Sequence, residues 1–114
     1  MRKPLVFLNE GRYRRVYLSR TGKYVIKIPI NHVGEADNGS EDFSYHFSAN
    51  NENLARCKAF FYNNQLCLIM EKVEIIDWSK NSTVVPEWVS YVDCRQVGYN
   101  RDGKLVAYDW AVNK

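Results

Sequence analysis

Short β-rich runs separated by tight-turn residues constrain this chain more than any other feature of its sequence. The runs 4–8 and 13–19 flank Asn9-Glu10-Gly11-Arg12, and Thr21-Gly22-Lys23 then leads into a third run, 24–30. Turn-forming residues between runs rich in β-branched and aromatic residues indicate hairpins. Apolar residues alternate along 24–30 with a two-residue period, as in a strand with two unlike faces. We therefore expect three antiparallel strands in a meander.

The same pattern returns in the second half of the chain. The runs 58–62 and 65–71 flank Asn63-Asn64, a pair that tolerates positive φ and suits a type I′ turn. A last hairpin is expected to pair 96–99 with 105–108 across Asn100-Arg101-Asp102-Gly103. These runs add two strands to the first three and place a separate hairpin near the C-terminus.

Helical signals are weaker than the strand signals. Residues 31–42 are polar and acidic and show no periodic apolar face, so we expect a mobile loop there. Apolar residues at 43, 47, 54 and 57 favour a helix that begins near Ser44 or Ser48 and ends near Arg56. Residues 77–85 are predicted to be a linker, and Pro86 suits the first turn of a short helix over 87–91. The fold class is α+β: a five-stranded antiparallel sheet, one main helix and a C-terminal β-hairpin.

Length and composition indicate one folded domain. The 114 residues are 46% apolar, enough for a single core and too much for a disordered chain. No apolar run approaches the ~20 residues that span a bilayer, and the N-terminus is unlike a signal peptide, so we expect a cytoplasmic protein. Three widely spaced cysteines, Cys57, Cys67 and Cys94, lack a zinc-binding spacing and are expected to be reduced.

The charge is unevenly distributed along the chain. Residues 1–30 carry eight of the 16 basic residues but only one of the 13 acidic residues, so the remainder is net negative. A basic segment of this kind can attract an anionic partner. It is also what a strand edge protected against edge-to-edge pairing would carry.

Two segments of the first half resemble nucleotide-binding elements of the protein-kinase-like superfamily. Residues 8–17 are similar to its glycine-rich loop, although only Gly11 stands where that loop has three glycines. There Arg12 and Arg14 would supply guanidinium charge to phosphates in place of backbone dipoles. Val25-Ile26-Lys27-Ile28 resembles the strand whose lysine, here Lys27, holds nucleotide phosphates. The resemblance implies a small lobe that binds ATP.

Three later segments continue this resemblance in the same order. Glu52 stands where the kinase helix has the glutamate that pairs with the lysine. Residues 67–73 are similar to the strand leading into the adenine-binding hinge, with Glu71 and Val73 at the hinge. Residues 96–110 resemble the stretch from the catalytic-loop asparagine to the metal-binding aspartate, which makes Gln96 and Asp109 candidate Mg²⁺ ligands.

The resemblance implies an abridged kinase in a single domain, residues 1–114. Residues 1–76 match the small lobe, 77–92 are a linker with a short helix, and 93–114 match the metal-site hairpin. No His-Arg-Asp motif is present, and Asp93 is displaced from the position of the catalytic base. Phosphoryl transfer requires a nucleophile held in line with the γ-phosphate. We therefore expect a pseudokinase-like protein rather than a working kinase, with no cofactor required.

Each matching segment also has a purely structural interpretation. Residues 8–17 would form an ordinary hairpin with a basic tip. Lys27 would lie on the solvent face of an amphipathic strand, and Glu52 would lie on the exposed surface of a polar helix. Residues 67–73 would be a plain core strand, and Asp109 would simply end a strand. These interpretations differ from the kinase-like one in a single geometric respect: whether Lys27 meets Glu52 and Asp109 in a shared cleft.

Three functions follow as hypotheses. The first is a non-catalytic kinase-like module that binds a protein partner, by analogy with small bacteriophage proteins that redirect enzymes of their bacterial host. The second is an ATP- and Mg²⁺-binding minimal phosphotransferase. The third is nucleic-acid binding through basic residues of the N-terminal hairpin with one aromatic residue: Arg12, Tyr13, Arg14, Arg15 and Arg20.

Overall fold

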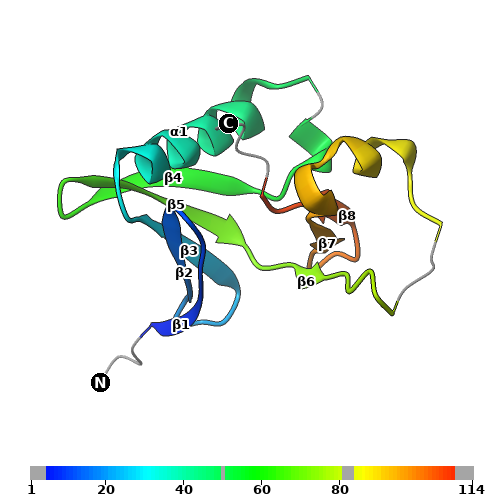
Figure 1. Ribbon diagram of the computed structural model, residues 1–114, viewed down its shortest axis with the longest axis horizontal. Helices are drawn as coiled ribbons and strands as arrows, with labels where there is room; N and C mark the ends of the chain where they lie inside the picture. Colours follow the sequence, from blue (N-terminus) through cyan, green and yellow to red (C-terminus); the bar gives the residue numbers. More distant parts are fainter. Residues whose placement is uncertain (1–4, 50, 81–83, 110–114) are drawn as a thin grey trace.

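Two antiparallel sheets and one long helix make up the protein (Figure 1). The computed structural model describes residues 5–49, 51–80 and 84–109, without the side chain of Asp93. The larger sheet has the strand order β1-β2-β3-β5-β4, and the smaller one has the order β6-β7-β8. The strands of the larger sheet are β1 (Val6–Glu10), β2 (Arg14–Leu18), β3 (Tyr24–Pro29), β4 (Cys57–Tyr62) and β5 (Gln65–Glu71).

The predicted hairpins of the larger sheet are confirmed. β1, β2 and β3 form the antiparallel meander, and β4 pairs with β5 through the Asn63-Asn64 turn. Both turn residues have positive φ, 51° for Asn63 and 61° for Asn64, as a type I′ turn requires. β5 also pairs with β3, opposite Lys27 at Leu68. This pairing joins the two hairpin units into one five-stranded sheet, with β3 at its centre and β5 between β3 and β4.

The main helix lies where the sequence predicted a loop. α1 covers His32–Phe47 and lies along one face of the five-stranded sheet (Figure 1). The side chain of Asn31 caps it by accepting hydrogen bonds from the backbone N–H groups of Val33 and Gly34. The predicted helix from Ser44 or Ser48 to Arg56 is wrong, because α1 ends at Phe47 and only a short 3₁₀ turn, η1 (Asn51–Asn53), follows.

The buried face of α1 is polar, which explains why a search for apolar periodicity missed it. Its buried residues, Gly34, Asp37, Asn38 and Glu41, recur at helical spacing. The apolar signal came from Phe43 and Phe47, and these side chains are exposed. The helix is therefore held to the sheet by charge and hydrogen bonding more than by an apolar stripe.

The second sheet extends the predicted C-terminal hairpin by one strand. β7 (Val97–Tyr99) and β8 (Leu105–Ala107) form the hairpin, and β6 (Glu74–Ile75) pairs with β7. Two 3₁₀ turns, η2 (Glu87–Tyr91) and η3 (Asp93–Arg95), precede it. A parallel bridge between Leu54 and Ala107 joins this sheet to the segment that follows α1. Val106 of β8 also belongs to one apolar cluster with Leu68 and Met70 of β5, so the hairpin packs against the larger sheet.

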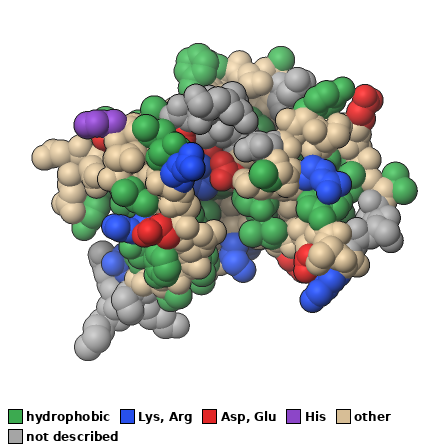
Figure 2. All heavy atoms as spheres, in the orientation of Figure 1, with side chains coloured by type: hydrophobic (Ala, Val, Ile, Leu, Met, Phe, Trp, Pro, Cys, Tyr) green, Lys and Arg blue, Asp and Glu red, His purple; other side chains and the backbone are tan. Residues whose placement is uncertain are grey.

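Two apolar clusters form the core. One lies between the larger sheet and the rest of the chain and contains Ala55, Cys57, Leu68, Met70 and Val106. The other lies between η2 and the smaller sheet and contains Ile76, Val89, Val97 and Ala107. On the face shown in Figure 2, acidic and basic side chains are interspersed. None of the helices in the described ranges is long and apolar enough to cross a membrane.

Gly34 is required for the close approach of α1 to the first hairpin. A Cβ atom at this position would collide with the carbonyl oxygen of Tyr13 and would lie 3.0 Å from Pro29. We predict that Gly34→Ala lowers the free energy of unfolding by about 2 kcal/mol or more, measured by urea denaturation, because backbone must move to relieve the clash.

Gly39→Ala is the matched control on the same helix. Its added Cβ would lie 3.4 Å from the flexible end of Leu66, and alanine favours a helix interior over glycine by about 1 kcal/mol. We expect this variant to match or exceed the wild type. Equal destabilisation by the two substitutions would show that the Tyr13 contact does not hold the helix in place.

Candidate functional site

Lys27 is the centre of the site. It lies on β3, on the face that α1 covers, and its side chain is only 5% exposed. Its ammonium Nζ donates to Glu41 Oε1 at 2.9 Å and to the carbonyl oxygen of Tyr108 at 2.7 Å. These contacts connect β3 to α1 and to the end of the C-terminal hairpin. A solvent-facing position for Lys27, the plain structural interpretation, is wrong.

Arg14 makes a second buried connection to the same carboxylate. Its guanidinium donates from Nη1 to Glu41 Oε1 at 2.9 Å and from Nη2 to Oε2 at 2.8 Å. The same two nitrogens donate to Asn38 Oδ1 and to Asp109 Oδ1, each at 3.0 Å. All the terminal N–H groups of Arg14 are therefore used. The prediction that Arg14 reaches out to phosphates does not fit this geometry.

Glu41 stays ionised because two cations offset its burial. Its side chain is fully buried, and burial alone would raise the pKa of its carboxyl. The charges and hydrogen bonds of Lys27 and Arg14 outweigh burial and lower the pKa of Glu41 to about 2. Arg14 responds in the opposite direction, since Glu41 raises the pKa of its guanidinium despite burial.

Asp109 is held at the edge of this cluster. Its side chain is 41% exposed and accepts the hydrogen bond from Arg14. Burial is the largest influence on the pKa of Asp109 and raises it, and repulsion from Glu41 adds to this effect. Attraction to Lys27 and Arg14 lowers the pKa but does not outweigh burial. Lys27 and Asp109 thus lie close enough to interact, as the kinase-like interpretation expects.

Asn38 anchors α1 to the sheet beside the charged cluster. Its side-chain amide donates to the carbonyl oxygens of Lys27 at 3.2 Å and Leu66 at 2.8 Å, and its Oδ1 accepts from Arg14. A helical side chain therefore satisfies the backbone of two neighbouring strands. This fixes the position of Glu41 one turn further along the helix.

A cavity of about 330 Å³ opens next to the cluster. Its wall is largely apolar, and Lys27 and Asp109 lie in its lining. Small-molecule sites commonly measure 300–1,000 Å³ and combine apolar walls with a few polar groups. The residues lining this cavity are Leu8, Asn9, Val16, Val25, Lys27, Met70, Glu71, Lys72, Val73, Ile75, Tyr108 and Asp109.

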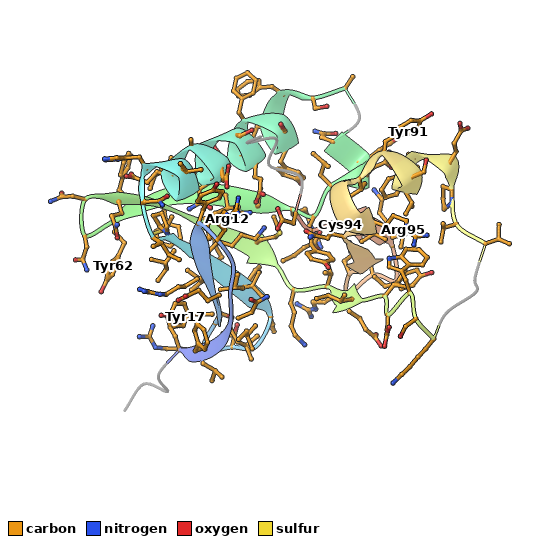
Figure 3. All side chains as sticks on the ribbon, viewed as in Figure 1. Arg12, Tyr17, Tyr62, Tyr91, Cys94 and Arg95 are labelled. Atoms are coloured by element: carbon orange, nitrogen blue, oxygen red, sulfur yellow. The ribbon has the colours of Figure 1, made fainter. Side chains whose placement is uncertain are left out.

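The predicted glycine-rich loop forms the turn between β1 and β2. Gly11 donates its backbone N–H to Arg14 O at 2.9 Å, and a Cβ there would find ordinary packing space. The turn therefore does not depend on glycine. Arg12 lies at this tip (Figure 3) and is exposed, with its guanidinium 5.9 Å from the ring centroid of Tyr13.

Glu52 does not pair with Lys27, so the predicted pair is wrong. Glu52 lies in η1 and lines a different hollow, with Tyr45, Arg56 and Lys104. Glu41, eleven positions earlier in the chain, takes its place because α1 begins and ends earlier than predicted. A carboxylate on the main helix does pair with Lys27, but it is Glu41 and not the predicted Glu52.

The two predicted hinge residues line the cavity but differ in their contacts. The Glu71 carboxylate is turned away to Arg56, accepting from the guanidinium at 2.9 Å and from the backbone N–H at 2.8 Å. Val73 lies between β5 and β6, and its backbone makes no hydrogen bond within the described residues. Among the described residues, nothing therefore occupies the Val73 amide at the cavity.

The remaining predicted residues contribute little to this site. Gln96 accepts a backbone hydrogen bond from Tyr108 at 3.1 Å, but it is not part of the cavity lining. Asp93 belongs to η3, and its side chain lies outside the described part of the structure. Within the described ranges, no cluster of three or more metal-ligating side chains is present.

The basic hairpin is partly neutralised within the protein. Arg14 is buried against Glu41, and Arg15 donates to Glu10 at 2.7 Å. Two of the arginines expected to hold a nucleic acid are therefore already bound to carboxylates. This arrangement weakens the case for a polyanion site on the hairpin.

Sequence reasoning missed Glu41, Asn38 and the Tyr108 carbonyl. A signal for the first two was present: Gly34 and the polar residues at 37, 38 and 41 recur at i, i+3, i+4 and i+7. Such spacing usually identifies a buried helix face through apolar residues, whereas here the buried face is polar.

A search for protein families and a search of curated proteins found no match to this chain.

The pKa of Glu41 makes stability sensitive to acid. Because folding lowers its pKa from 4.5 to about 2, the contribution of Glu41 is complete above about pH 5 and is lost as pH falls towards 2. We predict that protonation of Glu41, as pH falls from about 5 to 2, lowers the free energy of unfolding by roughly 3 kcal/mol. The raised pKa of Asp109 acts in the opposite direction and reduces the net loss.

Chemical denaturation at several pH values checks this prediction. The exposed carboxylate Glu74 provides a control, and Glu74→Gln is expected to keep the wild-type acid dependence. Glu41→Gln lacks the titrating group, so its unfolding free energy should be lower at neutral pH and change less with acid. An identical pH dependence for the wild type and Glu41→Gln would contradict the assignment.

Proposed function

We propose that the cavity beside Lys27 binds a nucleotide and that the chain is a binding module of kinase-like design. The proposal is carried by one observation: a buried lysine is fixed by a helical carboxylate at the edge of a mostly apolar cavity. Phosphate is the ligand group that a fixed ammonium favours, and apolar walls favour the flat face of a base.

The donor count of Lys27 supports this ligand. An ammonium group carries three N–H donors, and within the described residues Glu41 and Tyr108 accept two of them. The third is available to an acceptor in the cavity. Because Glu41 and Tyr108 hold the ammonium in place, a ligand does not have to offset the loss of side-chain freedom.

The apolar part of the cavity suits a purine ring. Val16 and Val25 come from adjacent strands, and Met70 pairs with Val25 across the β3–β5 register. The free backbone of Val73 supplies a hydrogen-bonding edge beside these walls. A flat heterocycle with donors and acceptors along its rim matches this combination of surfaces.

Binding rather than phosphoryl transfer is the proposed activity. Asp109, the residue expected to hold a metal ion, is engaged by Arg14, and Gln96 does not line the cavity. Phosphoryl transfer depends on a positioned metal and nucleophile. The described residues around the cavity do not offer these groups.

The proposal predicts a lysine-dependent stabilisation by nucleotide. ATP or ADP at ~100 times its dissociation constant should raise the free energy of unfolding by about 2.7 kcal/mol. Lys27→Met should remove most of this gain, measured by thermal shift and by isothermal titration, because it deletes the phosphate-binding charge. Lys58→Met, on an exposed site of β4, is the matched control and should behave as the wild type.

Circular dichroism establishes that both variants are folded before titration. No binding of ATP, ADP or adenosine to the wild type would contradict the nucleotide proposal. Equal nucleotide affinities for the wild type and Lys27→Met would show that nucleotide does not bind at Lys27. Either result would leave the apolar cavity without the proposed ligand.

A protein partner is the second candidate, and an exposed aromatic pair favours it. Phe43 and Phe47 lie one turn apart on the outer side of α1, 64% and 73% exposed, with ring centroids 4.9 Å apart. Aromatic residues are enriched in the centres of protein interfaces. If the chain is phage-encoded, the partner would be an enzyme of the bacterial host.

A paired pull-down tests this second candidate. Wild-type protein and the double variant Phe43→Ser, Phe47→Ser are used as baits in the same bacterial lysate. We expect a partner that the wild type captures and the variant loses, at unchanged fold, because the pair supplies the buried contact. Identical captured proteins for both baits would exclude this surface as the docking site.

A further inference from the structure

We propose that the guanidinium of Arg14 takes the place of a divalent metal beside Asp109, so that this site binds nucleotide without Mg²⁺. The inference rests on the proposed nucleotide function and deepens it. The kinase-like resemblance implies a magnesium ion held by Asp109. The contacts of Asp109 in this structure do not fit that ion.

One oxygen of the Asp109 carboxylate and both oxygens of the Glu41 carboxylate are already shared with cations. Asp109 Oδ1 accepts from Arg14 Nη2 at 3.0 Å. Both oxygens of Glu41 are also occupied, Oε1 by Lys27 and Oε2 by Arg14. Within the described residues, no group of three metal-ligating side chains gathers here or elsewhere. A divalent metal ion at Asp109 would therefore lie beside the Arg14 guanidinium and near the Lys27 ammonium, without the set of oxygen ligands that it requires.

Arg14 cannot easily leave this position. Its terminal N–H groups make the full set of hydrogen bonds to Asn38, Glu41 and Asp109, and its side chain is 8% exposed. Removing one partner from a buried ion pair leaves an uncompensated charge, which is strongly unfavourable. Arginine is also charged at every physiological pH. The positive charge beside Asp109 is thus a permanent part of the fold.

The cations of the cluster already balance its carboxylates, so the cluster needs no metal ion for charge neutrality. Arg14 and Lys27 are positive, Glu41 and Asp109 are negative, so the four side chains are formally neutral. A metal-free nucleotide brings more negative charge to Lys27 than its magnesium complex does. A magnesium ion at Asp109 would have to share that carboxylate with the Arg14 guanidinium and would lie close to a fixed positive charge.

Isothermal titration of the wild type with ADP and ATP, in EDTA and in magnesium, tests the inference. We expect the affinity in EDTA to equal or exceed the affinity in magnesium. An affinity that falls more than about tenfold in EDTA, ~1.4 kcal/mol, would overturn the inference and leave the nucleotide proposal intact. Absence of binding in both buffers would overturn both.

Asp109→Asn is the informative variant because asparagine can still accept the hydrogen bond from Arg14. If Arg14 replaces the metal, this variant should bind ADP in EDTA at least as tightly as the wild type, since it removes a negative charge near the phosphates. A loss of affinity confined to magnesium buffer would instead identify Asp109 as a metal ligand. The partial exposure of Asp109 makes the substitution tolerable to the fold.

Mn²⁺ alone gives a readout that does not depend on nucleotide. Titration of Mn²⁺ followed by its electron paramagnetic resonance signal should show no saturable site that differs between the wild type and Asp109→Asn. Saturable binding to the wild type that Asp109→Asn abolishes would show that Asp109 holds a metal despite Arg14. That outcome would overturn the inference even if nucleotide did not bind.

Discussion

The fully buried carboxylate of Glu41 is the interaction on which the rest of this structure depends. It receives Lys27 from β3 and Arg14 from β2, and through Arg14 it is connected to Asp109. Burying charges is costly unless each finds partners of opposite sign and complete hydrogen bonding. Because α1 presents a polar face to the sheet, the helix can pack there only when these pairs form together.

The charged cluster also fixes the polar end of the cavity. Lys27 is held by Glu41 and by the Tyr108 carbonyl, so its ammonium is positioned before any ligand arrives. The residues around Tyr108 belong to the C-terminal hairpin, which the Leu54–Ala107 bridge ties to the segment after α1. Elements far apart in sequence therefore meet at one site, and the proposed ligand would contact several of them at once.

The strands could be predicted from the sequence, whereas the helix and half of the site could not. Alternation along 24–30 and the Asn63-Asn64 turn are local signals, and the structure confirms both. Lys27 and Asp109 were also assigned to one cleft, and both line the cavity. Glu52 was chosen as the partner of Lys27 because the helix was expected after residue 43, where exposed Phe43 and Phe47 imitate an apolar face.

The sequence by itself determined the α+β class, the hairpins and the residue types needed for a charged site, since these depend on neighbours within a few positions. Only the tertiary structure decided that Glu41 would neutralise Lys27 and that Arg14 would turn inward to Asp109. A carboxylate on a polar segment has the same local pattern whether it faces water or a buried cation. Its partner is selected by the folded sheet and helix, because burial makes an unpaired charge far more costly than a paired one.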